Sequence, residues 1–146
     1  MNILVSHCFL GDPCRYDGTS RLDRQVLELH RAGHNLIPVC PELLGGLDVP
    51  RSPAELQPDG RVVTQDGEDV TAQYRAGAER AVEIAKEHGC TVAVLKARSP
   101  SCGSGKIYDG TFTGTLKPGW GLAARLLDEA GLEIMDEEHL QAWLYE

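Results

Sequence analysis

The chain has 146 residues, 42% of them hydrophobic and 25% charged, which is typical of a soluble globular protein with one core. No apolar run approaches the roughly 20 residues that a membrane-spanning helix needs, so we expect no membrane segment. The formal net charge of -8 disfavours a nucleic-acid partner, because the 14 basic residues that would neutralise phosphates are scattered. The amino terminus lacks a basic leader, and we expect a cytoplasmic protein.

Short apolar runs alternate with amphipathic segments, and each of the three longer amphipathic segments ends in glycine. Glycine commonly closes a helix, whereas apolar runs without alternation are typical of strands buried on both faces of a parallel sheet. In chain order we expect a strand at 2–6, a helix at 20–33, a strand at 35–40, an edge strand or hairpin at 60–69, a helix at 69–89, a strand at 90–97, a helix at 121–131, a strand at 132–136 and a last helix at 137–146.

This alternation of strands and helices predicts an α/β fold. We expect an open, mainly parallel sheet with helices on both faces, Rossmann-like or flavodoxin-like, in a single domain over 1–146. Two long connections without regular structure, at 40–60 and 97–119, are candidates for functional loops, because long loops are uncommon in compact domains.

Three of the five cysteines follow predicted strands. Cys8 and Cys40 come at the ends of the first two strands, and Cys102 lies in the loop after the third. Ligands of open parallel sheets bind beyond the carboxyl ends of the strands, so we expect these three thiols at one crevice. Cys90 opens its strand instead, about 20 Å from that edge, and is expected to be a buried structural residue.

Three thiolates around one crevice can hold a metal with one coordination position open. For zinc, an open position indicates catalysis, and in a cubane iron–sulfur cluster three cysteines leave one iron free as a Lewis acid. Ligation by thiolates alone favours iron–sulfur or soft-metal chemistry. A catalytic zinc site, an enzyme with a single reactive thiol at Cys102, and a non-enzymatic cluster carrier or sensor with Cys14 as fourth ligand remain alternatives.

The stretch SPSCGSGKIYDG, residues 99–110, has the glycines and lysine of a phosphate loop but not its pattern. Pro100 stands where the first glycine belongs, and Ile107 replaces the serine or threonine that coordinates magnesium. Gly103 and Gly105 instead suggest backbone amides that approach a cluster and donate hydrogen bonds to its sulfurs.

Longer blocks of the sequence resemble one family. ILVSHCFLG, VCPELLGGLDVPR, LKARSPSCGSGKIYDGTFTGTL and GWGLAARLLDEAGLEI, with CRYDG, PAEL and GEDVT, are similar to the thiouracil desulfidase (TudS-like) family over almost the whole chain. The resemblance implies a [4Fe-4S] cluster held by Cys8, Cys40 and Cys102. It also implies removal of sulfur from thiouracil without net redox change, which gives uracil and sulfide.

That reaction needs a group that moves protons and a group that orients water or the ring. Glu42, two residues after Cys40, is the acid–base candidate. The resemblance implies that a serine next to Cys102 takes part, and the sequence leaves Ser99 and Ser101 open. If this loop is extended, the two serines share a face.

Other residues are candidates to line the substrate pocket, foremost Arg15 and Tyr16. Arg51 is expected to pair with Glu55 or with another buried acid. Members of the broader group that act on thiouridine in tRNA carry an additional domain, and we expect no such extension here. We therefore expect a small thiolated pyrimidine as the partner, with no nucleic acid or membrane, and make no prediction of oligomeric state.

Overall fold

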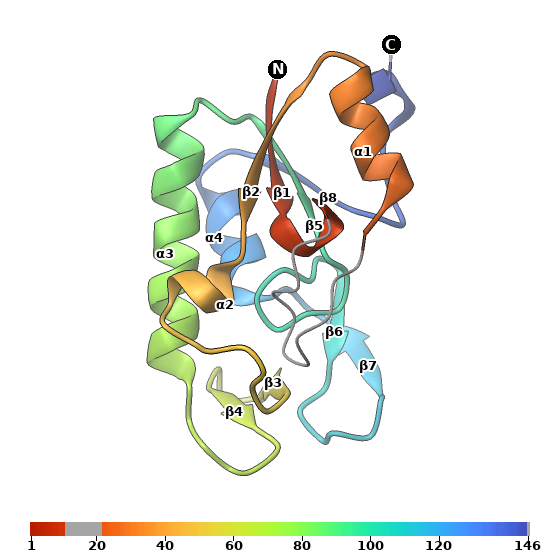
Figure 1. The fold of residues 1–146 in the computed structure, drawn as a ribbon. Helices are drawn as coiled ribbons and strands as arrows, with labels where there is room; N and C mark the ends of the chain where they lie inside the picture. Colours follow the sequence, from red (N-terminus) through yellow and green to blue (C-terminus); the bar gives the residue numbers. More distant parts are fainter. Residues whose placement is uncertain (11–21, 146) are drawn as a thin grey trace.

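The computed structural model describes residues 1–10 and 22–145 and has a parallel sheet at its centre (Figure 1). The second strand of this sheet pairs with one side of the first, and the two later strands continue on the other side. This order is flavodoxin-like, and the predicted α/β class is confirmed. In spatial order, the strands are β2 (Asn35–Val39), β1 (Asn2–Ser6), β5 (Val92–Leu95) and β8 (Glu133–Asp136).

Helices cover both faces of the sheet, as the sequence predicts (Figure 1). The helices α1 and η2 lie on one face, and α3 and α4 lie on the other. No helix among the described residues is long and apolar enough to cross a membrane. In chain order, the helices are η1 (His7–Leu10), α1 (Arg24–Arg31), α2 (Pro41–Leu44), α3 (Thr71–Glu87), α4 (Leu122–Glu129) and η2 (Ala142–Tyr145).

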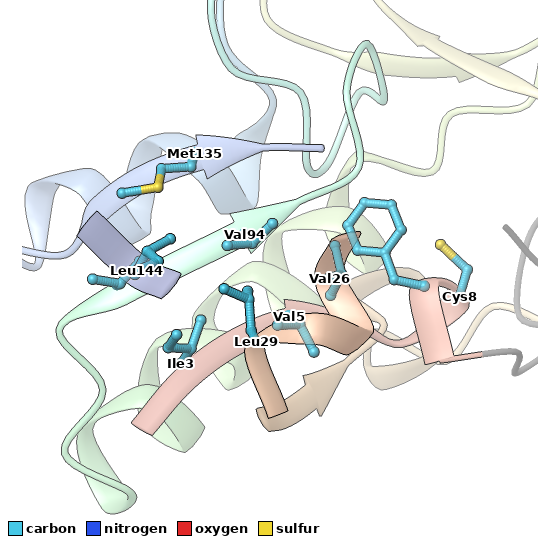
Figure 2. Packing of buried hydrophobic residues seen from close by; sticks show 10 residues of the cluster. Ile3, Val5, Cys8, Val26, Leu29, Val94, Met135 and Leu144 are labelled. Atoms are coloured by element: carbon cyan, nitrogen blue, oxygen red, sulfur yellow. The ribbon is translucent and has the colours of Figure 1, made fainter. Parts of the chain in front are cut away.

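The core is divided by the central strand β1. Ile3 and Val5 belong to a fully buried cluster with Leu29 of α1 (Figure 2). Leu4, between them in the chain, points to the opposite face and packs in a cluster with Leu127 of α4. Successive strand residues alternate in this way, so apolar side chains on both faces fix the strand. The loops that leave its carboxyl end therefore start from a rigid base.

Two antiparallel hairpins lie beyond the carboxyl ends of the parallel strands (Figure 1). The edge strand or hairpin predicted within 60–69 is confirmed, since residues of this segment form the second strand of the first hairpin. The hairpin strands are β3 (Ala54–Leu56) with β4 (Val62–Thr64), and β6 (Lys106–Tyr108) with β7 (Leu116–Pro118).

The short helix α2 is held against α3 by a contact between glycines. A Cβ atom on Gly77 would lie 1.7 Å from the carbonyl oxygen of Pro41, and one on Gly45 would lie 1.9 Å from that of Gln73. Only glycine allows the two backbones to approach so closely. Because Pro41 follows Cys40, this contact fixes the loop that carries one of the predicted ligands.

Two elements begin or pack differently from the prediction. The helix expected at 20–33 begins at Arg24, because the Asp23 carboxylate accepts the Val26 N–H at 3.0 Å and caps the helix there. The strand expected to be buried on both faces at 35–40 is an edge strand, and Pro38 within it has no N–H to leave unpaired.

The prediction of a last helix at 137–146 is wrong. Over the described part of this segment, the structure has only the short helix η2. The reason lies in side chains that bind backbone groups: the Asp136 carboxylate accepts the Glu138 N–H at 2.9 Å, and the Glu137 carboxylate accepts the Ala97 N–H at 2.7 Å. Such contacts compete with helical hydrogen bonds and tie this segment to the sheet.

Candidate metal centre and active site

A cavity of about 480 Å³ opens at the carboxyl ends of β1, β2 and β5. Cys8, Cys40 and Cys102 all line it, so the structure brings together the three thiols that the sequence placed at one edge. The chain leaves β1 towards β2 on one side and later returns to β5 on the other, which makes this a topological switch point. Crevices at such points are the usual ligand sites of open α/β sheets.

Each of the three thiols comes from a different loop. Cys8 lies in η1 directly after β1 and is 5% exposed. Cys40 is the half-buried residue that precedes α2, and Cys102 is a buried residue of the turn after β5. By contrast, Cys90 lies at the amino end of β5, buried in the core and absent from the cavity, in agreement with the prediction.

The turn that carries Cys102 is closed by Ser99. The hydroxyl oxygen of Ser99 accepts the N–H groups of Ser101 at 3.0 Å and Cys102 at 3.1 Å. The Ser99 carbonyl oxygen accepts the Gly103 N–H at 2.9 Å, so this amide is already used within the turn. The expected donation from Gly103 to a cluster sulfur is therefore not supported by this structure.

The same turn is anchored on the amino end of α4. The carbonyl oxygens of Pro100 and Ser101 accept the N–H groups of Leu122 and Ala124, each at 3.0 Å. A Cβ atom on Gly121 would lie 2.5 Å from the carbonyl carbon and oxygen of Ser101. The first N–H groups of a helix have no partner inside the helix, and here the turn satisfies two of them.

Ser99 and Ser101 do not share a face, because the loop is a turn rather than an extended strand. Ser99 lines the cavity, whereas Ser101 is fully buried and does not line it. Within the described residues the Ser101 hydroxyl makes no well-formed hydrogen bond. It does lie near the Cys102 thiol, where it and the Ser6 hydroxyl lower the pKa of that thiol.

Two other effects on the pKa of the Cys102 thiol act in the opposite direction and are stronger. Burial first, and the nearby charge of Glu42 second, raise the pKa of the Cys102 thiol to about 12. The thiol therefore carries its proton at neutral pH in the absence of a metal. A metal that binds here displaces this proton, because the thiolate is the ligand.

Glu42 also lines the cavity, in the first turn of α2, and forms an ion pair with Arg51. The side chains of Glu42 and Arg51 are 16% and 8% exposed. Burial would lower the pKa of Arg51, but the charge and hydrogen bond of Glu42 outweigh it and raise this pKa. Burial, followed by the charge of Glu42, raises the pKa of Tyr74 in α3, so its hydroxyl stays protonated beside the carboxylate. The sequence predicted a buried partner for Arg51, and that partner is Glu42 rather than Glu55.

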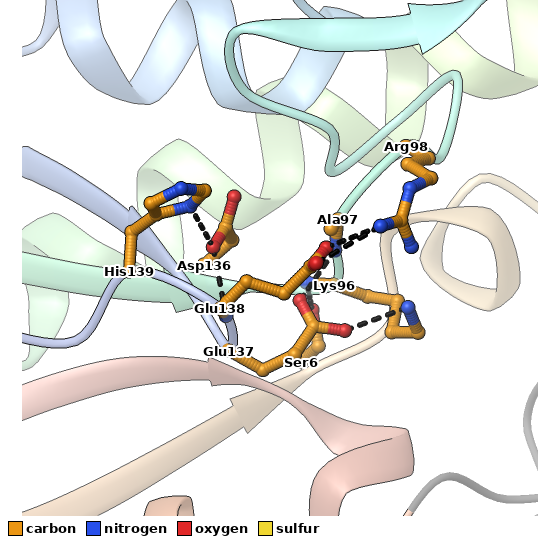
Figure 3. Close-up of polar contacts among 8 residues, drawn as sticks. All are labelled: Ser6, Lys96, Ala97, Arg98, Asp136, Glu137, Glu138 and His139. Carbon is orange, nitrogen blue, oxygen red and sulfur yellow. Dashed lines mark hydrogen bonds and ion pairs between the residues drawn. The ribbon is translucent and has the colours of Figure 1, made fainter. Parts of the chain in front are cut away.

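A second ion pair, which the sequence did not predict, lies at the end of β5. The Lys96 ammonium is 2.6 Å from a Glu137 carboxylate oxygen, and the other oxygen accepts the Ala97 N–H (Figure 3). The Lys96 N–H in turn donates to the Ser6 hydroxyl at 2.9 Å. Lys96 and Ser6 both line the cavity. The only sequence signal was a charged residue at the end of a buried strand.

Glu55 and Phe112 are two further cavity residues that the sequence did not single out for the site. Glu55 belongs to β3 and Phe112 to the loop between β6 and β7. The pocket candidates Arg15 and Tyr16, and the alternative ligand Cys14, lie outside the described residues.

The donor set fits a cluster better than a single ion. No three Cys, His, Asp or Glu side chains within residues 1–10 and 22–145 are placed to hold one metal ion. In a cubane cluster each cysteine binds a different iron, so its ligands stand further apart than those of one ion. Three thiols around one cavity of about 480 Å³ match that arrangement and leave room for a small ring.

Comparison with known proteins agrees with this chemistry. Residues 3–139 match the 2-thiouracil desulfurase family. The chain belongs to this family. A solved structure of TudS, described as a [4Fe-4S]-dependent thiouracil desulfidase, has a TM-score of 0.86 and 43% identity, covering 94% of this chain and 91% of that one. The uncharacterized protein YbbK of Bacillus subtilis (strain 168) is 42% identical over 147 residues, covering 94% of this chain and 97% of that protein.

Proposed function

We propose that this protein is a [4Fe-4S]-dependent desulfidase that converts thiouracil-type bases into the corresponding uracils. The reaction exchanges sulfur for oxygen: a thiocarbonyl group and water give a carbonyl group and hydrogen sulfide, with no electron transferred. The observation that carries the proposal is the single cavity that three thiols share with Glu42, in a chain that belongs to the 2-thiouracil desulfurase family.

Cys8, Cys40 and Cys102 are the proposed ligands of the cluster. When bound by three cysteines, a [4Fe-4S] cluster supplies one iron that accepts the thiocarbonyl sulfur and polarises the carbon–sulfur bond. The protein contributes rigidity, because each thiol sits on a loop that is fixed by packing or by backbone hydrogen bonds. These fixed loops keep the thiols around one crevice rather than letting them bind separate metals.

Glu42 is the proposed proton carrier. Water that adds to the ring carbon must lose a proton, and the leaving sulfide must gain one. Arg51 donates to one oxygen of Glu42, and the Tyr74 hydroxyl lies beside the same carboxylate. These partners fix the orientation of Glu42 at the cavity wall, which supports its role as a positioned acid–base group.

We assign the two serines different roles. The Ser99 oxygen accepts two backbone N–H groups, so its own hydrogen remains available to donate to a group inside the cavity. We propose that Ser99 orients the substrate ring or the attacking water. Ser101 is fully buried beside the Cys102 thiol and supports that ligand rather than touching the substrate.

The proposed partner is a small thiolated pyrimidine rather than a nucleic acid. A cavity of about 480 Å³ is in the range of pockets that enclose small molecules. The formal net charge of -8 works against a polyanionic partner. We further propose that the protein works as one domain in a reducing, cytoplasmic setting, because the proposed cluster needs its cysteines as thiolates rather than in disulfides.

Anaerobic reconstitution followed by incubation with 4-thiouracil tests the proposal. We expect four iron and four sulfide per chain, loss of the near-ultraviolet absorbance of the substrate, and release of sulfide. A colourless protein that contains only zinc would contradict the cluster. A reconstituted protein that leaves 4-thiouracil unchanged would identify a cluster carrier or sensor instead of an enzyme.

A further inference from the structure

We propose that Phe112 is the residue against which the pyrimidine ring packs, and that Glu55 is the positioning residue that holds Phe112 at the cavity. This inference rests on the proposed function, since it names how the same site recognises its substrate. It concerns the ring rather than the sulfur, so it assigns specificity to residues other than the proposed cluster ligands.

The backbone of Phe112 adopts a conformation that side chains avoid. Its φ of 58° lies in the left-handed region, where residues other than glycine are uncommon. Gly110 and Gly114, on either side, have φ of 97° and 76°. A glycine at 112 would adopt this conformation without strain, yet the chain carries a phenyl ring there and the residue lines the cavity. Strain retained beside a cavity points to a function of that side chain.

Glu55 holds this loop in place. Its side chain is 8% exposed, and its Oε1 atom accepts the N–H groups of Gly110 at 2.9 Å and Phe112 at 3.2 Å. Gln57, two residues further on, donates to the Gly110 carbonyl oxygen at 3.1 Å. The segment from 55 to 57 therefore clamps the loop on both its donor and its acceptor groups, and so compensates the strain at Phe112.

Three of the described aromatic residues line the cavity, Tyr74, Tyr108 and Phe112, and only Phe112 among them has a side chain without a polar atom. The Tyr74 hydroxyl lies beside Glu42. Cys8, Cys40 and Cys102 lie at the sheet edge, and Glu42 and Lys96 are charged. A flat heterocycle needs an apolar surface for its face, and an aromatic side chain provides one with a favourable stacking geometry. Phe112 lies on the hairpin loop rather than at the sheet edge, where the thiols are. A ring packed against it would lie in the same cavity as the three thiols.

Uracil binding tests the inference without desulfuration, because uracil has the ring but no sulfur. Calorimetric titration of the reconstituted protein with uracil is expected to show a Kd about tenfold higher in Phe112→Leu than in wild type. Phe112→Tyr, which keeps the ring, is expected to recover most of the binding. Trp120→Leu, at an exposed aromatic outside the cavity, is the matched control and should leave the Kd unchanged.

Kinetics separate a positioning role of Glu55 from a catalytic one. Glu55→Leu is expected to raise the KM for 4-thiouracil about tenfold while kcat falls less than threefold. Glu55→Gln keeps an oxygen that accepts both N–H groups and is expected to restore KM. If kcat instead fell at least about a hundredfold in both Glu55→Gln and Glu55→Leu, Glu55 would be a proton carrier and the positioning role would be wrong.

The outcomes also distinguish this inference from the proposed function. If the wild-type protein binds uracil through Phe112 but releases no sulfide from 4-thiouracil, the role of Phe112 in ring recognition is supported and the desulfidase proposal is wrong. Wild-type desulfuration with an unchanged uracil Kd in Phe112→Leu, or no uracil binding by wild type, would overturn the role of Phe112. Circular dichroism and iron content are compared with those of the wild type to confirm that each variant is folded.

Discussion

One buried thiol precedes strand β5 and another lies in the turn after it; both pack in the same apolar cluster, but only the second lines the cavity. Burial raises the pKa of both Cys90 and Cys102. At the amino end, Cys90 is surrounded by core residues, and nearby polar side chains pair with one another and with backbone, as Asn2 does with the His88 carbonyl oxygen and with Asn35. At the carboxyl end, Cys102 shares a cavity with two other thiols and a carboxylate.

This difference shows that a functional site forms where donor side chains from several loops converge, and that burial of a thiol alone does not create one. Loops that follow parallel strands all leave the sheet at one edge, so donors from distant parts of the chain meet there. At the other edge the chain enters the strands, and here it packs Cys90 into the core. Cys102→Ser and Glu42→Gln change residues at the carboxyl end of the sheet, and each is compared with a matched variant elsewhere.

The largest expected effect is the loss of the cluster in Cys102→Ser. Serine removes the soft sulfur donor at a buried position, so iron and sulfide content after anaerobic reconstitution should fall far below wild type and activity should fall below detection. Cys90→Ser, the matched change at the other end of β5, should retain the wild-type iron content. Equal iron in the two variants would remove Cys102 from the ligand set.

A large but smaller effect is expected for Glu42→Gln. The amide keeps the shape of the carboxylate but cannot carry the proton, so kcat should fall by roughly 10²–10⁴ while iron content is retained. Glu83→Gln, in the exposed ion pair with Arg80, is the control and should leave kcat unchanged. An unchanged kcat in Glu42→Gln would assign the proton transfer to another group.

Gly77→Ala should destabilise the protein, although helix propensity alone favours alanine over glycine inside a helix. The new Cβ atom would overlap the Pro41 carbonyl oxygen, so the free energy of unfolding should fall by about 1–3 kcal/mol. The neighbouring Ala76→Gly, at an exposed position, should lose only about 0.5–1 kcal/mol through propensity. Urea unfolding measures both, and a stabilised Gly77→Ala would contradict the close packing of α2 on α3.

The smallest expected effect is that of Cys14→Ser. With three ligands from the sheet edge, the cluster should keep its iron content and its open coordination position, and activity should stay within a factor of two of wild type. If Cys14→Ser lost the cluster as completely as Cys102→Ser, four cysteines would hold it. The Lewis-acid mechanism would then be wrong, and a carrier or sensor would be favoured.

Much of the fold follows from local patterns. Glycines 33, 89 and 131, predicted to close helices, all have positive φ in the structure, since few other residues adopt that conformation. The last helix could not be predicted correctly, because the contact of Glu137 with Ala97 joins residues 40 positions apart. The same reason hid the role of Glu55, which accepts N–H groups from residues 55 and 57 positions further along the chain. Arg51 and Glu42 are only nine positions apart, but their pairing depends on how the chain folds back after α2.

The sequence by itself determined the α/β class, the edge of the sheet at which Cys8, Cys40 and Cys102 meet, and the resemblance to thiouracil desulfidases. These depend on strand direction and on motif, both of which are local along the chain. The tertiary structure decided that Ser99 rather than Ser101 lines the cavity, that Glu42 is held by Arg51, and that Glu55 binds the backbone of Phe112 at the cavity wall. Those facts depend on turn geometry and on contacts between loops, which no local pattern encodes.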